Sequence, residues 1–306
     1  MDNSSAGYHV PVLLQECIDA LNIKTDGVYV DCTFGGGGHS RAILGQLGPG
    51  GRLIAFDQDA DAVRNLPADE RLLFVPHNFR HLQRFLRMYG IEKVDGLLAD
   101  LGVSSHQFNE GSRGFSYRFE AELDMRMDQR QNVTAATILN TYSAAQLQQL
   151  LSQYGEVTNA RTLAAAILEA RSSQQLHTIG QLLQVLAPLA KGNPHRYYAQ
   201  VFQALRMEVN AEMETLKEML QQLPAVVKTG GRIAIITFHS IEDRLVKQFF
   251  KQGSFDTAEE DPIYGRRQQV PFTPISKKPI EPSKAELKLN PRSGSAKLRV
   301  VELRLG

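Results

Sequence analysis

The chain has 306 residues, of which 42% are hydrophobic and 22% charged, and its net charge is +1. These values are typical of a globular protein and exclude a disordered chain, a collagen and a coiled coil. The apolar stretches are shorter than a membrane-spanning helix, and the first residues show no secretory signal. The two cysteines, Cys17 and Cys32, form no disulfide framework, so we expect a cytoplasmic protein.

Short apolar runs bounded by turn residues predict the strands of a parallel sheet. Helical patterns lie between the early runs, which indicates successive βαβ units of a doubly wound α/β sheet. The predicted strands are 27–31, 51–57, 71–75, 94–100 and 231–237, with helices at 39–47, 60–66 and 81–89 between the first four. A closing strand is expected at 297–305, after a long loop at 257–295 that is rich in Pro and Lys.

The alternation of strands and helices stops near Gly111 and returns only at Ile233. Capping boxes begin at Ser143 and Thr178, and each opens an apolar helical run. Further helices are expected at 158–170 and 198–223. We therefore expect an all-helical domain inserted into an α/β domain. The inserted domain would comprise residues 112–195, and the α/β domain residues 1–111 and 196–306.

A glycine-rich loop follows the first strand, at the edge of the sheet where open α/β folds bind ligands. It reads Asp31-Cys-Thr-Phe-Gly-Gly-Gly-Gly-His-Ser40, and the second strand ends in Asp57. The loop lacks the lysine of a P-loop, and its glycine spacing fits the dinucleotide pattern poorly. The remaining class is an S-adenosylmethionine site, in which Asp31 precedes the loop and Asp57 accepts hydrogen bonds from the ribose hydroxyls. A pyrophosphate ligand is disfavoured and stays open.

Two further residues end or follow strands at the same edge. Asp100 ends the fourth strand, where a carboxylate favours a functional role over a structural cap. Phe79 follows the third strand and fits core packing and an adenine contact equally well. The sequence shows no H-E-x-x-H motif and no Cys/His cluster, so we expect no metal site.

The C-terminal residues 261–306 carry a net charge of +6, whereas residues 1–260 carry −5. A basic segment of this kind can bind phosphate groups, and the alternative is a solvated charged surface. The candidate phosphate contacts are Lys277, Lys278, Lys284, Arg292 and Lys297.

Several longer motifs occur in order along nearly the whole chain. Besides the glycine loop they are Leu98-Ala-Asp-Leu-Gly-Val-Ser-Ser105, Arg113-Gly-Phe-Ser116, Leu123-Asp-Met-Arg-Met-Asp128, Phe202-Gln-Ala-Leu-Arg206, Gly230-Gly-Arg232, Phe238-His-Ser-Ile-Glu-Asp-Arg244 and Asn290-Pro-Arg-Ser293. This set resembles the bacterial small-subunit ribosomal RNA methyltransferase H family, of MraW type. The resemblance implies a Rossmann-like, S-adenosylmethionine-dependent methyltransferase domain with an inserted helical substrate-recognition domain. It also implies methylation of the exocyclic N4 of a cytidine in the decoding centre of 16S ribosomal RNA.

The resemblance also implies site residues and partners. The cofactor contacts fall on Gly37, Gly38, His39, Asp57, Phe79, Asp100 and Gln107. Asp100 is in addition the candidate catalytic residue, because an oxygen acceptor near the reacting amine stabilises the charge that develops there. The expected partner is 16S ribosomal RNA within the small ribosomal subunit, with neither membrane nor DNA, and a homodimer is left open.

One segment departs from the family pattern. Where the family has Pro-Ala-Thr-Arg before the Phe-Gln-Ala-Leu-Arg motif, this chain has Asn193-Pro-His-Arg-Tyr-Tyr-Ala-Gln200. Two other functions compete with RNA methylation. A non-catalytic assembly factor that binds RNA is disfavoured by the intact glycine loop. A DNA amino-methyltransferase is disfavoured because Asp100 is followed by Leu-Gly-Val rather than by Pro-Pro and an aromatic residue.

Overall fold

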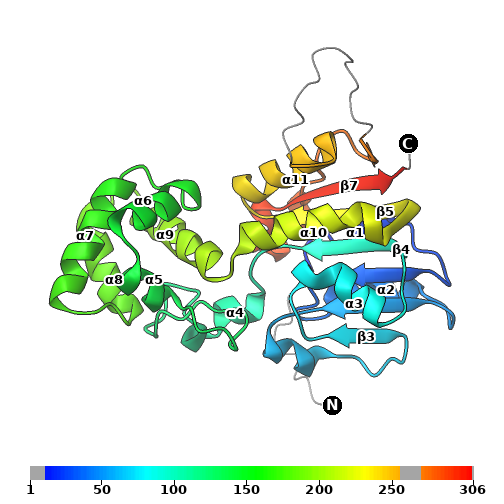
Figure 1. Ribbon diagram of the computed structural model, residues 1–306, viewed down its shortest axis with the longest axis horizontal. Helices are drawn as coiled ribbons and strands as arrows, with labels where there is room; N and C mark the ends of the chain where they lie inside the picture. Colours follow the sequence, from blue (N-terminus) through cyan, green and yellow to red (C-terminus); the bar gives the residue numbers. More distant parts are fainter. Residues whose placement is uncertain (1–10, 256–269, 305–306) are drawn as a thin grey trace, which may run out of the picture. The chain divides into compact units, whose positions relative to one another are not determined.

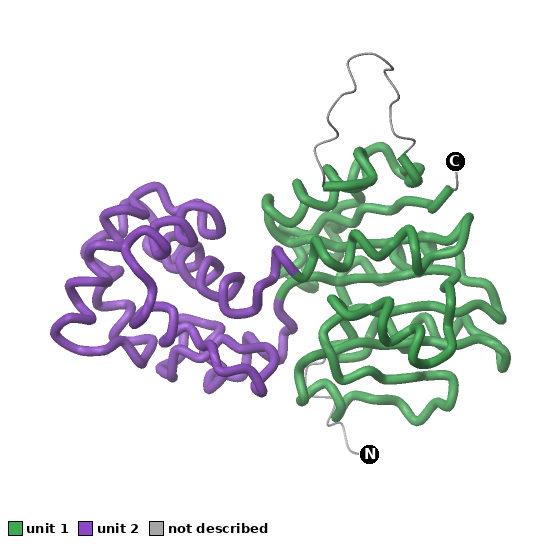
Figure 2. Tube along the Cα trace, in the orientation of Figure 1, with its two compact units in different colours: residues 1–102, 215–306 green, residues 103–214 purple. Residues whose placement is uncertain are grey.

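The computed structural model describes residues 11–255 and 270–304. The chain divides into two compact units, residues 1–102 with 215–306 and residues 103–214 (Figure 2). The second unit is longer at both ends than the expected insertion, 112–195. The reason is packing: Phe108 on one side and Val201 and Phe202 on the other contribute to its apolar core.

The first unit is built on a sheet that has seven strands in the described part of the chain, in the order β3-β2-β1-β4-β5-β7-β6 (Figure 1). The strands are β1 (Val28–Asp31), β2 (Arg52–Phe56), β3 (Leu72–Val75), β4 (Val94–Asp100), β5 (Val227–Thr237), β6 (Phe272–Pro274) and β7 (Lys297–Leu303). β1 to β5 pair in parallel, and β7 is antiparallel to both β5 and β6. The order reverses between β1 and β4, which is the switch point where open α/β sheets bind ligands.

Helices cover both faces of this sheet. They are α1 (Leu14–Leu21), α2 (Gly38–Gln46), α3 (Leu82–Met88), α10 (Glu212–Val226), α11 (Ser240–Gln252) and α12 (Lys284–Leu289). Side chains of β4 alternate between two apolar clusters. Leu97 packs with residues of α3, α10 and α11, and Leu98 packs with residues of α1 and α2. Burial on both faces explains why the strands appear in the sequence as unbroken apolar runs.

The second unit is helical, with α4 (Ser105–Asn109), α5 (Ala135–Thr141), α6 (Ala144–Gln153), α7 (Ala160–Ser173), α8 (Ile179–Leu186) and α9 (Pro194–Val209). Both predicted capping boxes are confirmed, since Ser143 and Thr178 each accept a hydrogen bond from the backbone of the third helical residue. Among residues 11–255 and 270–304, every helix falls short of the length and apolar character that a membrane span requires.

Three predicted elements differ from the structure. The expected helix at 198–223 is two helices, α9 and α10, because Ala211 adopts a left-handed conformation (φ 46°) between them. Residues 60–65 form a 3₁₀ helix rather than an α-helix. The expected loop at 257–295 contains β6 and α12 in its described part, and residues 256–269 lie outside the described residues.

Candidate active site

The glycine-rich loop connects β1 to α2 in a conformation that needs glycine. Gly35 and Gly37 have φ values of 50° and 74°, in the left-handed region that favours glycine. A Cβ on Gly37 would lie 2.8 Å from both the Phe34 ring and the Arg41 guanidinium. A Cβ on Gly38 would lie 2.1 Å from Pro11. These two predicted cofactor residues are therefore also required by the packing of the loop itself.

Asp57 holds this loop from the end of β2. Its Oδ2 accepts a hydrogen bond of 2.7 Å from the backbone N–H of Gly35, and its Oδ1 accepts one of 2.8 Å from that of Asp59. Burial raises the pKa of Asp57 to about 7, although these two hydrogen bonds favour the ionised form. A carboxylate has about four acceptor positions. Beside these two backbone hydrogen bonds, two acceptor positions of Asp57 therefore stay available for ligand hydroxyls.

Asp31 and Thr33 connect the loop to the end of β4. The Oδ2 of Asp31 accepts a hydrogen bond of 2.7 Å from the Ser40 hydroxyl, and its Oδ1 accepts one of 3.0 Å from the Thr33 backbone. The Thr33 hydroxyl in turn accepts a 2.7 Å hydrogen bond from the backbone N–H of Asp100. The sequence marked Asp31 as a ligand carboxylate. In the structure its oxygens hold the protein's own loop, which positions Asp100.

His39 lies in the first turn of α2 and is buried. Burial lowers its pKa, so the neutral imidazole is favoured. Its Nε2 is 3.0 Å from the Val12 carbonyl, which can only accept, so Nε2 carries the proton and Nδ1 carries a lone pair. Nδ1 is 3.7 Å from Oδ2 of Asp100, too far for a hydrogen bond. His39 therefore holds the Val12 backbone, just before α1, and places a lone pair beside the Asp100 carboxyl.

The surroundings of the Asp100 carboxyl disfavour its ionised form. Burial, together with the negative charges of Asp31 and Glu242, raises its pKa well above the ordinary value. Its Oδ1 is buried and has no hydrogen-bond partner within the described residues. Leaving a buried polar atom unpaired costs about 1–3 kcal/mol. An N–H donor of a ligand would satisfy this oxygen.

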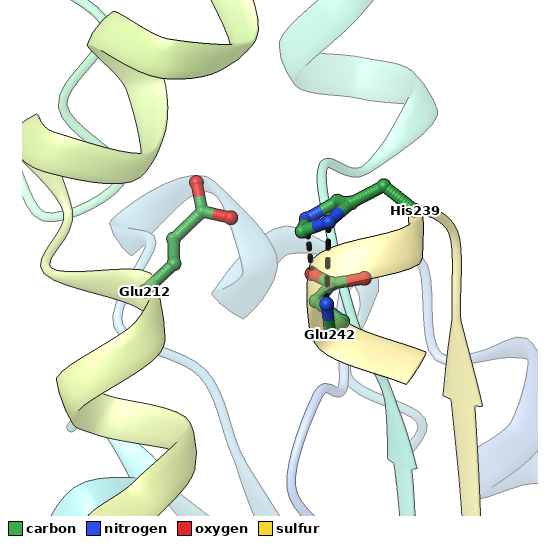
Figure 3. Close-up of side chains that lie close together, drawn as sticks. All are labelled: Glu212, His239 and Glu242. Carbon is green, nitrogen blue, oxygen red and sulfur yellow. Dashed lines mark hydrogen bonds and ion pairs between the residues drawn. The ribbon is translucent and has the colours of Figure 1, made fainter. Parts of the chain in front are cut away.

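The end of β5 carries a pair that the sequence placed in a motif without assigning it a role. The backbone N–H of Glu242 donates to His239 Nδ1 over 3.3 Å, and Glu242 Oε1 lies 3.1 Å from His239 Nε2 (Figure 3). Glu242 Oε2 accepts a 2.9 Å hydrogen bond from the Phe238 backbone. The pair caps α11 and brings a buried carboxylate close enough to raise the pKa of Asp100.

Phe79 and Gln107 are the remaining predicted cofactor residues. Phe79 begins a 3₁₀ turn after β3 and is half-buried against the apolar cluster beneath α3 and α10. The neighbouring Asn78 donates a 2.7 Å hydrogen bond to Gln58, which joins the ends of β2 and β3. Gln107 lies in the second unit, where its Oε1 accepts a 3.1 Å hydrogen bond from the Ser104 backbone and completes the capping box of α4. The first unit thus brings together Gly37, Gly38, His39, Asp57 and Asp100.

Comparison with known proteins gives the family. The model of the MraW methylase family matches residues 6–304 of this chain. The chain belongs to the MraW methylase family. The methylase is 52% identical to the ribosomal RNA small subunit methyltransferase H of Bacteroides thetaiotaomicron, over 99% of both chains. The protein of the same name from Flavobacterium psychrophilum is 52% identical, over 95% of this chain and 99% of that one.

The likeness to solved structures is weak. An rRNA methylase from Streptococcus thermophilus covers 97% of this methylase and 100% of its own chain, with 12% identity and a TM-score of 0.43, which is too low to carry an argument. The family assignment therefore rests on the sequence matches, and it agrees with the sheet order. It confirms the expected Rossmann-like α/β class, a methyltransferase activity and S-adenosylmethionine as the cofactor.

Proposed function

We propose that this methylase transfers the methyl group of S-adenosylmethionine to the exocyclic N4 of a cytidine in the decoding centre of 16S ribosomal RNA. Relatives that are about half identical over the full chain are named as methyltransferases of small-subunit ribosomal RNA. The structural observation that carries the proposal is the buried, unpaired Oδ1 of Asp100 at the switch point of the sheet.

The residues at the ends of β1 and β2 suit the cofactor. Asp57 keeps acceptor positions for two ribose hydroxyls, and the loop with Gly37, Gly38 and His39 presents a close backbone surface beside it. We assign Phe79 to the adenine, and we assign Gln107 and Asp100 to cofactor contacts as the family resemblance implies. When bound, the cofactor supplies an electrophilic methyl group on a positively charged sulfonium.

The acceptor side requires help for a poor nucleophile. The N4 amine of cytosine is conjugated with its ring, so its lone pair is poorly available. A hydrogen bond from an N4 hydrogen to Asp100 favours the pyramidal nitrogen and stabilises the positive charge that develops on it. A positive charge near Asp100 also lowers its raised pKa, so the bound cofactor favours the ionised carboxylate. Asp100 is therefore our candidate acceptor for the amine proton.

Positioning supplies the rest of the acceleration. Holding the amine in line with the methyl group turns an encounter of two molecules into a reaction within one complex. The Asp31–Thr33 connection serves this purpose, because it fixes the backbone of Asp100 to the glycine loop. A base inside a helix is inaccessible, so the cytidine must leave its stack. We assign recognition of the RNA around this cytidine to the helical second unit. We place the reaction in the cytoplasm, on RNA within the small ribosomal subunit.

A substrate comparison tests this proposal. Radiolabelled S-adenosylmethionine is incubated with the methylase and, separately, with small ribosomal subunits that lack the modification, free 16S RNA, and duplex DNA. We expect label in RNA and none in DNA. Label in DNA would indicate an amino-methyltransferase of DNA. Tight binding to subunits without any transfer of label would indicate an assembly factor instead.

A further inference from the structure

Four aromatic side chains of the second unit pack together in a group that we call the ladder. His195, Tyr198 and Phe202 belong to α9, and Tyr117 comes from an earlier segment. Phe202 is buried in the core of this unit, and the Tyr117 ring meets it edge-on with centroids 5.7 Å apart. The His195 ring lies nearly parallel to Tyr117, with an interplanar angle of 25° and centroids 6.0 Å apart. Tyr198 meets Tyr117 and His195 edge-on, at 5.8 and 6.4 Å. The ladder thus runs from the core to the exposed imidazole of His195.

The inner members of the ladder hold the outer one in place. Tyr117 and Tyr198 are half-buried and pack against the apolar core of the second unit. The Asn193 side chain accepts a 3.0 Å hydrogen bond from the backbone N–H of His195, which sets the first turn of α9. An exposed ring that is held by packed aromatic neighbours can stack with a nucleobase at little entropic cost, because few side-chain rotamers have to be frozen.

Three exposed cations are close to the ladder residues in the chain. Arg196 follows His195, and Arg118 follows Tyr117; both arginines are exposed. Lys191, just before α9, is exposed as well. The next acidic residue along the chain from Arg118 is Glu120, whose carboxylate lies against Gly180 in α8. An exposed flat ring beside cations matches the two parts of a nucleotide, a base to stack upon and a phosphate to neutralise.

We propose that this surface, which comprises Tyr117, His195, Arg196 and Tyr198 and which we term the His195 platform, binds single-stranded RNA. A base stacks on His195, and Arg196 contacts a neighbouring phosphate. The inference rests on the proposed function, since it assigns a place on the second unit to the RNA substrate. It also gives a role to the segment of residues 193–200, which departs from the family pattern. Stacking tolerates any base, so the platform adds affinity and orientation rather than base choice.

The binding test uses the full-length protein and two fluorescent probes, single-stranded oligocytidylate and a strand of equal length with abasic sugars. His195→Ala should weaken oligocytidylate binding about 5- to 150-fold and leave abasic-strand binding unchanged, because only the base stacks. His195→Phe should keep most of the wild-type affinity. Arg196→Gln should weaken binding to both strands and reduce the salt dependence by a slope of about 0.7, the value of one phosphate contact on a single strand.

His177→Ala is the matched control, because His177 is exposed in the same unit and its ring pairs with the polar side chain of Gln175, 3.1 Å away, rather than with an aromatic ring within the described residues. It should bind both strands as wild type does. Thermal melting and S-adenosylmethionine affinity, measured on every variant, report whether the fold is intact. Unchanged oligocytidylate affinity in a folded His195→Ala variant would overturn the inference. The platform would then be a candidate surface for a protein partner instead. Equal losses for both probes would also overturn it, because the contact would then be with phosphate alone.

The outcome for the proposed function is read separately. Wild-type protein that methylates small subunits while His195→Ala binds and methylates equally well would end the platform assignment and keep the enzyme assignment. Wild-type protein that transfers no methyl group to RNA would end the enzyme assignment. Even in that case, a base-dependent loss of binding in His195→Ala would show that His195 contacts RNA.

Discussion

Replacing Asp57 with Asn tests the cofactor site most sharply. In the structure each carboxylate oxygen already accepts one backbone hydrogen bond, from Gly35 at 2.7 Å and from Asp59 at 2.8 Å. The amide of Asn keeps one acceptor oxygen but turns an NH₂ group toward the other backbone N–H, and it removes the negative charge. At least one charge-assisted hydrogen bond is lost, worth about 1.5–3 kcal/mol. The dissociation constant for S-adenosylmethionine should therefore rise roughly 10- to 150-fold.

Titration calorimetry measures this change, with Asp59→Asn as the control. Asp59 is a buried carboxylate two residues away, and its side chain accepts a hydrogen bond from the Asp61 backbone at the start of the 3₁₀ turn at 60–65. The control should bind nearly as wild type does. Asn is preferable to Ala at position 57, since Ala would remove both backbone hydrogen bonds and disturb the loop directly. An Asp57→Asn constant within about twofold of wild type would refute the ribose assignment.

The pH dependence of binding follows from the same carboxyl. Burial raises the pKa of Asp57 to about 7, so the free protein holds a proton there more tightly than an ordinary aspartate. Ribose hydroxyls donate best to the ionised form. Affinity should therefore increase as pH rises through about 7 and level off above it, and this rise should be absent in Asp57→Asn. Because the pKa of Asp57 is raised in the folded protein, its protonation stabilises the fold fully below pH 3.8, and this contribution is lost as the pH rises from 3.8 to about 7. A pH-independent wild-type affinity would contradict this reasoning.

Three further predictions concern other parts of the molecule. Asp100→Asn should lower the single-turnover rate of methyl transfer at saturating cofactor by about 10²–10³, and an unchanged rate would remove Asp100 from the chemistry. Replacing Lys277 and Lys278 with Gln should weaken RNA binding and flatten its salt dependence by about 0.7 per lost contact, without affecting the cofactor; an equal slope would assign these lysines to solvent. Asn210→Ala should lower the free energy of unfolding of the second unit by about 2–5 kcal/mol, because the buried Asn210 side chain hydrogen-bonds to the backbone of Met127 and of Met125. Urea titration measures this change, and an unchanged midpoint would argue against that role.

The sheet was predictable because its strands are buried on both faces. Residues 97–99 of β4 and 233–236 of β5 alternate between two different cores, so each of these stretches is an unbroken apolar run in the sequence. β6 was not predictable in this way. It is three residues long, includes a proline, and exists through its pairing with β7, in which Phe272 lies opposite Leu303. Such a strand is defined by a distant partner rather than by its own pattern.

The break between α9 and α10 has a similar cause. The helical pattern continues through residues 198–223, and Asn210 has no strong preference that would end it alone. Its side chain instead accepts a 2.7 Å hydrogen bond from the Met127 backbone and donates one of 2.8 Å to the Met125 carbonyl, more than eighty positions earlier in the chain. These long-range contacts favour the left-handed turn at Ala211 over a continuous helix.

The site was predictable in its positions and less so in its contacts. The sequence predicted that Asp57 and Asp100 share one edge of the sheet, because they follow or end parallel strands, whose carboxyl ends meet at one edge. That Asp31 serves the protein's own loop, and that Glu242 raises the pKa of Asp100, depend on spatial neighbours. The net charge of the C-terminal residues likewise does not show which cations are free to bind phosphate. Arg299, for example, forms a bidentate ion pair with Asp243, at 2.7 and 2.9 Å.

The most direct test of the central claim is to identify the nucleoside that the methylase makes. Small ribosomal subunits lacking the modification are incubated with S-adenosylmethionine and either wild-type protein or Asp100→Asn, and the decoding-centre fragment of 16S RNA is digested to nucleosides and analysed by mass spectrometry. We expect N4-methylcytidine with the wild type and little or none with Asp100→Asn. A methyl group on another atom or another base, or equal yields from the two proteins, would contradict this expectation.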